Sequence, residues 1–205
     1  MTLDTTQLVA IAAALGWASG LRLYAVLFCT GLASYFGWVV LPPGLHLLQS
    51  PWMLGASGCM LLVEFFADKI PGLDTVWDAL HTLLRIPAGA ALAAAVFGID
   101  QGQWAAGAAL LGGTLAATSH IAKATTRAAA NTSPEPFSNL GLSLAGDAAV
   151  PGMLWLSWAH PVLALAALAV AVVVMLVVTF VLMRFLHALL RGFREGRWLG
   201  RGSPA

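Results

Sequence analysis

A continuous uncharged stretch near the C-terminal end limits most strongly what this chain can fold into. Residues 161–183, PVLALAALAVAVVVMLVVTFVLM, contain no charged side chain. A helix needs about 20 apolar residues to cross the hydrocarbon core of a bilayer. Of the 205 residues, 60% are hydrophobic and 9% are charged, whereas soluble domains carry roughly 25% charged residues. The sequence therefore predicts an all-α integral membrane protein.

Other apolar segments bring the expected number of transmembrane helices to about six. Two of these segments, 5–41 and 102–131, are too long for one straight span. They contain Gly16 and Gly20 or the pair Gly112-Gly113, so each is either one tilted helix or two segments joined at the glycines. The Gly-x-x-x-Gly spacing also permits close helix packing. The remaining segments are 51–67, the short 86–100, and 137–158, which we expect to break at Pro151.

A weak internal similarity divides the chain near residue 100. Segments 67–96 and 146–170 both begin with a small residue and Asp, followed by a Pro-Gly pair, a stretch with aromatic residues, a second proline and an Ala/Leu-rich span. Three crossings in each half would make the halves antiparallel, as in transporters built from inverted repeats. We predict one membrane domain over residues 1–205, with repeats at about 5–99 and 102–183 and a basic tail at 184–205.

Basic residues predict the orientation and the partners. The tail contains several arginines, and Lys/Arg-rich segments beside membrane helices lie in the cytoplasm. With six crossings, both termini of a multi-pass protein of the inner (plasma) membrane would then be cytoplasmic. The lipid bilayer is the expected partner, with anionic lipid at the tail. No basic tract with interleaved aromatics indicates nucleic-acid binding, and the sequence leaves a homo-oligomer open. The tail arginines are Arg184, Arg191, Arg194, Arg197 and Arg201.

A charged stretch, EFFADKIPGLDTVWDALHTLLR (64–85), separates two uncharged runs. Glu64 and Asp68 are four residues apart and share one face of a helix. Residues 74–85 predict a short amphipathic helix of about 18 Å, too short to span the membrane. It should lie at the inner interface or re-enter the bundle. Its polar stripe, spaced i, i+4, i+7 and i+11, consists of Asp74, Asp78, His81 and Arg85.

A second polar stripe and two isolated charges complete the candidate site. His120, Lys123 and Arg127 share a helix face by their spacing, and Arg22 and Asp147 stand alone in apolar surroundings. A lone ion at mid-bilayer costs at least about 2.5–3.5 kcal/mol, so we predict pairing across helices. Some of the cations could instead mark the cytoplasmic interface. The candidate substrate or ion pathway is Arg22, Glu64, Asp68, Lys69, Asp74, Asp78, His81, Arg85, His120, Lys123, Arg127 and Asp147.

Three sequence blocks resemble a family of bacterial membrane proteins described as domain of unknown function 4126. The blocks are VEFFADKIPGLDTVWDALHTLLRIPAGA (63–90), TSHIAKATTRAAANTSPEP (118–136) and SLAGDAAV (143–150). The resemblance covers most of residues 15–165. It implies a polytopic membrane protein and no particular activity. Gly146 stands where the family pattern has the first of two adjacent acids.

Three functions remain open from the sequence. A small transporter or permease is favoured, because carboxylates beside a histidine carry protons or bind cations and a basic stripe can meet an anion. The alternative is a structural or assembly subunit whose charges hold helices together. An enzyme is disfavoured, since neither G-x-S-x-G nor H-E-x-x-H occurs. The two cysteines form no C-x-x-C pair, so we predict no metal site and no cofactor.

Overall fold

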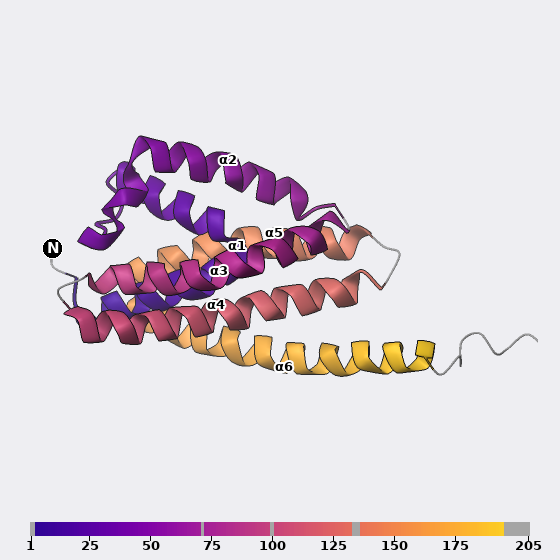
Figure 1. Cartoon of the computed structure of the whole chain (residues 1–205). Helices are drawn as coiled ribbons and strands as arrows, with labels where there is room; N and C mark the ends of the chain where they lie inside the picture. Colours follow the sequence, from indigo (N-terminus) through magenta and orange to yellow (C-terminus); the bar gives the residue numbers. More distant parts are fainter. Residues whose placement is uncertain (1–2, 71, 99–100, 133–135, 195–205) are drawn as a thin grey trace, which may run out of the picture.

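The computed structural model describes residues 3–70, 72–98, 101–132 and 136–194, and all regular structure within these ranges is helical. Figure 1 shows a bundle in which α2 to α6 run between its two ends. The all-α class is therefore confirmed. The elements are α1 (Thr5–Tyr35), the 3-10 helix η1 (Pro43–Gln49), α2 (Pro51–Ala67), α3 (Leu73–Phe97), α4 (Gly102–Ala130), α5 (Pro136–Ala159) and α6 (Pro161–Arg194).

The helices have the length and composition of membrane spans. Five of them, α1 and α3 to α6, are long and apolar enough to cross a membrane. The pair η1 and α2, bent by 68° at their junction, raises this number to six by the same criterion. α6 is the most apolar, and large side chains such as Val170, Val173 and Val177 are exposed along it. An exposed apolar surface of this extent is suited to lipid, and the chain is a multi-pass membrane protein.

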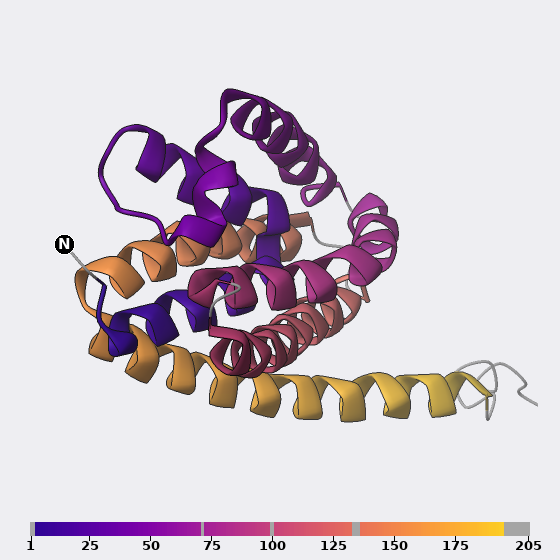
Figure 2. The same cartoon turned by 60° about the vertical axis from the view of Figure 1, so that its left-hand side comes forward.

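α1 is two half-helices joined at Arg22, where the backbone leaves helical geometry (φ −149°, ψ 88°). The second arm folds back, so both ends of α1 lie at the same end of the bundle (Figure 2). Residues from both arms, including Gln7 and Thr30, line one cavity together with the last turns of α5. Of the two alternatives predicted for 5–41, the structure adopts the two-segment one, with the break at Arg22 rather than at the glycines.

This break changes the predicted topology. Because α1 returns to its starting end, only α2 and α3 of the first half run the length of the bundle, whereas α4, α5 and α6 all do so in the second (Figure 1). The two described ends of the chain therefore lie at opposite ends of the bundle. The prediction that both termini are cytoplasmic does not fit this arrangement. The prediction of three crossings in each half does not fit it either.

We predict that reporters fused to the two ends of the chain give opposite signals in a topology assay. The physical reason is the return of α1, which leaves an odd number of full crossings, α2 to α6, between the ends. A reporter placed in the loop 36–42 should agree with the N-terminal fusion. Equal signals from the two terminal fusions would contradict the arrangement.

The predicted short helix at 74–85 is the first half of α3, which continues through Pro87 to Phe97. A proline removes one backbone hydrogen bond, but packed membrane helices tolerate it because neighbouring groups compensate. α4 likewise runs without interruption past Gly112 and Gly113, and α5 runs past Pro151. For 102–131 the structure therefore adopts the single-helix alternative, whereas the predicted break at Pro151 and the predicted length of the amphipathic helix are wrong.

The predicted orientation of the amphipathic stripe is confirmed. Asp74, Asp78, His81 and Arg85 are all buried on the inner face of α3. Leu80 and Leu83, on the other face, are 66% and 81% exposed. The turn before α3 contains Gly72 with φ +88°, a left-handed conformation that glycine adopts without strain. This turn sends the chain from the end of α2 directly into the buried stripe.

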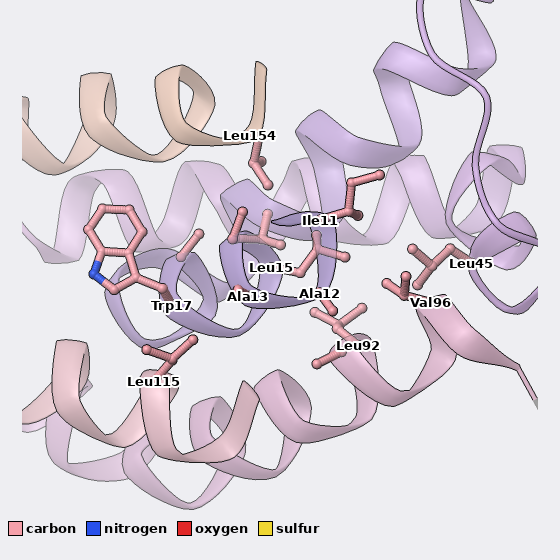
Figure 3. Packing of buried hydrophobic residues seen from close by; sticks show 14 of the residues in the cluster. Ile11, Ala12, Ala13, Leu15, Trp17, Leu45, Leu92, Val96, Leu115 and Leu154 are labelled. Carbon is pink, nitrogen blue, oxygen red and sulfur yellow. The ribbon is translucent and has the colours of Figure 1, made fainter. Parts of the chain in front are cut away.

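Small residues bring α1, α3 and α4 into close contact. A Cβ atom on Gly16 would overlap the backbone of Gly112, and one on Gly20 would overlap the carbonyl of Ala116 and the hydroxyl of Ser119. Around this crossing lies an apolar core, of which Figure 3 shows Ile11, Leu15, Leu92 and Leu115 among others. The predicted close packing at the Gly-x-x-x-Gly pattern is therefore present.

Gly20→Ala should lower the free energy of unfolding by about 1–3 kcal/mol, because overpacking a tight contact forces the backbones apart. Gly107→Ala on α4 is the matched control, since a Cβ atom at this position would have no neighbour within 4 Å among the described residues, and alanine is the better helix former. Unfolding in mixed detergent micelles, followed by circular dichroism, compares the two variants. Equal stability of both would refute the close approach of α1 and α4 at Gly20.

Candidate functional site

The break in α1 is stabilised by side chains of α4. Ser119 Oγ donates to the Trp17 carbonyl at 2.6 Å, and Lys123 Nζ donates to the Leu21 carbonyl at 3.0 Å. Carbonyls at the end of a helix have no partner within it, and inside a bundle they need one from another element. The interruption therefore forms where α4 supplies donors, and it places Arg22 in the protein interior.

Arg22 joins three helices. Its side chain is 1% exposed, with Nη2 3.1 Å from Asp68 Oδ2 at the end of α2 and Nη1 3.0 Å from Asp147 Oδ1 of α5. Nη2 also donates to the hydroxyl of Ser143 at 2.8 Å. Asp147 is partly exposed and lies 3.5 Å from Lys69 Nζ at the edge of the bundle. Arg22 therefore connects the broken helix to the two helices that face it.

Arg85 forms a second centre on α3. It is fully buried, with Nη2 2.7 Å from Glu64 Oε1 and Nη1 2.6 Å from Asp78 Oδ1. Glu64 is also fully buried, and it comes from α2. Short contacts of this kind are charge-assisted hydrogen bonds, which are stronger than neutral ones. This pair ties the charged end of α2 to the polar stripe of α3.

Asp68 and Asp78 connect the two centres through α4. Lys123 Nζ lies 3.1 Å from Asp68 Oδ2 and 3.2 Å from Asp78 Oδ1. Arg127 Nη1 lies 3.1 Å from Asp68 Oδ1 and 3.5 Å from Asp74 Oδ2. Five acids and five bases thus form one connected set, the charge network: Glu64, Asp68, Asp74, Asp78, Asp147, Arg22, Lys69, Arg85, Lys123 and Arg127.

The two predicted histidines occupy different positions. His120 contacts the charge network, because its ring nitrogens lie 3.5 Å from Arg85 Nη1 and 2.8 Å from Thr82 Oγ1. His81 instead stacks on Trp77 with ring centroids 3.9 Å apart, and its Nε2 lies 3.3 Å from the hydroxyl of Tyr24. The structure therefore places His120 beside the charges, and His81 in an aromatic cluster next to them.

The alternative of interfacial topology markers does not apply to the buried cations. Arg85 and Arg127 are 0% and 3% exposed and lie within the charge network. Lys69 lies nearer the surface, where its ammonium sits 3.0 Å above the Phe65 ring in addition to its contact with Asp147. Pairing across helices is thus observed for all ten charged residues, which come from α1 to α5 and the turn after α2.

The neutral partners of the charges were not predicted from the sequence. Ser143 receives hydrogen bonds from Arg22 and from Lys69, and Ser119 holds the broken end of α1. Single hydroxyls in apolar helices are common and carry little signal on their own. One signal was available for Ser143, because it stands four residues before Asp147 and therefore shares its helix face.

Two cavities lie along α1 and α5. The first, of about 230 Å³, adjoins the charge network. Its polar wall is formed by Arg22, Asp68, Lys123 and Arg127, and its remaining lining is mostly apolar and comes from α1, α4, α5 and α6. The second, of about 680 Å³, lies at the opposite end of the bundle between the arms of α1 and the last turns of α5. Its lining includes Gln7, Cys29, Thr30, Leu154 and Trp158.

Comparison with known proteins identifies the family. The sequence profile of the family Domain of unknown function (DUF4126) matches residues 9–181, which span the described bundle from the first turns of α1 to the middle of α6. No curated protein matches the chain. No solved structure matches it either.

Proposed function

The chain belongs to the DUF4126 family, and we propose that this member is a small membrane permease whose solute passes between α1 and α5. The observation that carries the proposal is the placement of the two cavities. Both follow these two helices, with residues 142–149 of α5 lining the first cavity and residues 151–159 lining the second. Together they extend along α5 from the charge network to the opposite end of the bundle.

A short barrier separates the two cavities. On α5, Val150 lies between the two sets of lining residues and is fully buried. On α1, Val26 is fully buried between Arg22 and Cys29, which line different cavities. The ion pair of Arg22 and Asp147 bridges the same two helices. A movement of α5 relative to one arm of α1, together with separation of this ion pair, would open the barrier.

The broken helix supports this proposal. Secondary transporters commonly build their sites from interrupted helices near the middle of the bilayer, where free backbone groups and ion pairs rearrange during transport. In this chain the interruption at Arg22 lies beside the first cavity, and the arm that follows it carries Val26 of the barrier. The charge network supplies the cations and carboxylates with which a charged solute would exchange partners.

The proposed orientation follows from the basic residues. Figure 1 shows that α2, α4 and α6 finish at the same end of the bundle. Lys69 follows α2, Lys123 and Arg127 lie in the last part of α4, and Arg184 and Arg191 lie in the last part of α6. We place this end in the cytoplasm of a cell with the protein in its inner membrane, and the N-terminal end on the other side. The arginine-rich end of α6 then approaches anionic lipid headgroups. Arg197 and Arg201 lie outside the described residues.

A structural role is the second candidate, and one observation favours it. Every acid of the charge network has a basic partner within 4 Å, as expected of a fixed connection between helices. The two candidates differ in what happens to the barrier. A permease must expose the barrier residues to water from each side of the membrane in turn. A fixed connection between helices keeps them buried from both sides.

Cysteine accessibility at Val150 distinguishes these candidates without knowledge of the solute. In a background with Cys29→Ala and Cys59→Ala, Val150→Cys is reconstituted in sealed liposomes and treated with an impermeant thiol reagent from either side. A permease should react from both sides. The control is Ala164→Cys, which is similarly buried but lines neither cavity, and which should react from neither. No reaction at Val150→Cys from either side would reject the permease and favour the structural role.

A further inference from the structure

We infer that the first cavity binds a single-chain amphiphilic anion, with its acidic head on Arg22 and Arg127 and the start of its chain against α5 and α6. This inference rests on the proposed permease and deepens it by naming the class of its solute. The binding site itself can be tested separately from transport. The inference stands on three features of the cavity: two guanidinium groups in its wall, the excess of bases over acids in its lining, and its apolar opening.

The first feature is a pair of guanidinium groups, those of Arg22 and Arg127, in the wall of the cavity. Both groups already bind carboxylates, since Nη1 of Arg22 lies 3.0 Å from Asp147 Oδ1 and Nη1 of Arg127 lies 3.1 Å from Asp68 Oδ1. Both side chains are almost fully buried, and both line the cavity. A guanidinium group has five N–H donors, and carboxylates and phosphates match its planar fork, so the two arginines can bind a further anionic head beside their present partners.

The second feature is the excess of basic over acidic residues in the lining of the cavity. Three cations, Arg22, Lys123 and Arg127, line the cavity, whereas Asp68 is the only acid that the described part of the chain contributes to its lining. The other acids that contact these cations, Asp147, Asp74 and Asp78, are not part of the lining. An entering anion therefore meets more cations than carboxylates. An entering cation would have to compete with three fixed bases for one carboxylate.

The third feature is the apolar opening. Apart from the charged residues, the lining includes Leu142 of α5 and Val174, Met175 and Val178 of α6. Val174 and Val178 are also exposed on the outer surface of α6, so the cavity reaches the face that contacts lipid. Pockets for drug-sized ligands usually hold about 300–1,000 Å³. At about 230 Å³ the cavity is suited to a head and the start of one chain.

Binding of radiolabelled dodecanoate to the protein in phosphatidylcholine nanodiscs tests the inference, with empty nanodiscs as background. We expect saturable binding that dodecyl phosphate displaces. Dodecyltrimethylammonium and inorganic phosphate should not displace it, because one lacks the negative head and the other lacks the chain. Displacement by the cation, absence of saturable binding, or equally effective displacement by phosphatidylglycerol would overturn a site for single-chain anions.

Two variants locate this binding in the cavity. Arg127→Gln should weaken it about tenfold, the equivalent of one charge-assisted hydrogen bond, and Arg127→Lys should retain part of it. Gly146→Leu fills the cavity without removing a charge. Gly141→Leu on the same helix lies in open space and is its matched control. Thermal unfolding measures whether each variant is folded. If Gly146→Leu does not fold, Ala149→Leu, which is also at the cavity lining, replaces it.

The outcomes separate the site from the permease. Unchanged binding in both Arg127→Gln and Gly146→Leu would place dodecanoate elsewhere and refute the site, whatever the accessibility of Val150→Cys. Specific binding together with an unreactive Val150→Cys would keep the site and reject the permease. Such a result would make the anion a bound constituent of the protein rather than a transported solute.

Discussion

Arg85→Gln is expected to lower the free energy of unfolding by about 3–5 kcal/mol, the cost of removing one partner from a buried ion pair. Arg85 is fully buried between Glu64 and Asp78, and it is the only base within 4 Å of Glu64 among the described residues. The substitution therefore leaves a carboxylate of α2 buried without a counter-charge. Denaturation in mixed detergent micelles gives the difference in free energy.

A second substitution tests whether the loss arises from this pair. Adding Glu64→Gln removes the stranded charge and should recover about 0.5–3 kcal/mol, the usual coupling between residues in contact. Arg191→Gln is the control for loss of an arginine. It is exposed on α6 and has no ion-pair partner in the described part of the chain, so its effect should be small. Additive effects of Arg85→Gln and Glu64→Gln would contradict the pairing.

The polar stripes could be predicted from the sequence alone. A helical period placed Asp78, His81 and Arg85 on one side of α3 and Leu80 and Leu83 on the other, and the structure shows this division. The energetic argument was equally local, because charges in a membrane need counter-charges whatever the detailed fold. The equal numbers of acids and bases in these segments therefore predicted ion pairs across helices without knowledge of the fold.

The break in α1 could not be predicted from local sequence. Arg22 is neither glycine nor proline, and its neighbours Leu21 and Leu23 are ordinary helix formers. The interruption is stabilised instead by Ser119 and Lys123, which lie about a hundred residues further along the chain. Because the topology of the first half depends on this interruption, the predicted side of the N-terminus depended on it as well.

The choice of partners also needed the fold. Pairing across helices was predicted without assigning partners, and Asp68 contacts Lys123, Arg127 and Arg22. Which base meets which acid depends on how far each helix is shifted along its neighbours. That shift is determined by close contacts such as those between Gly20 and Ala116, which join segments distant in sequence.

Asp68→Asn is expected to be as disruptive as the loss of Arg85, at about 3–5 kcal/mol, because it strands positive charge in the interior. Asp68 is fully buried and accepts contacts from Arg22, Lys123 and Arg127, each at 3.1 Å. After the substitution these three cations share one carboxylate fewer. The effect is measured as the change in free energy of unfolding and, independently, as the yield of folded protein from membranes.

Removing one cation should restore part of this loss, and the network predicts which cation is best removed. Lys123→Met leaves Asp78 with Arg85, whereas Arg127→Met leaves Asp74 without a base within 4 Å among the described residues. Asp68→Asn should therefore be rescued better by Lys123→Met than by Arg127→Met. The rescue stays partial, because Lys123 also donates a hydrogen bond to the Leu21 carbonyl at the break in α1.

Arg85→Met is the control for this rescue. Arg85 forms its ion pairs with Glu64 and Asp78 instead of Asp68, so its loss should simply add to the loss caused by Asp68→Asn. Equal effects of all three second substitutions would show that Asp68 has no specific partners.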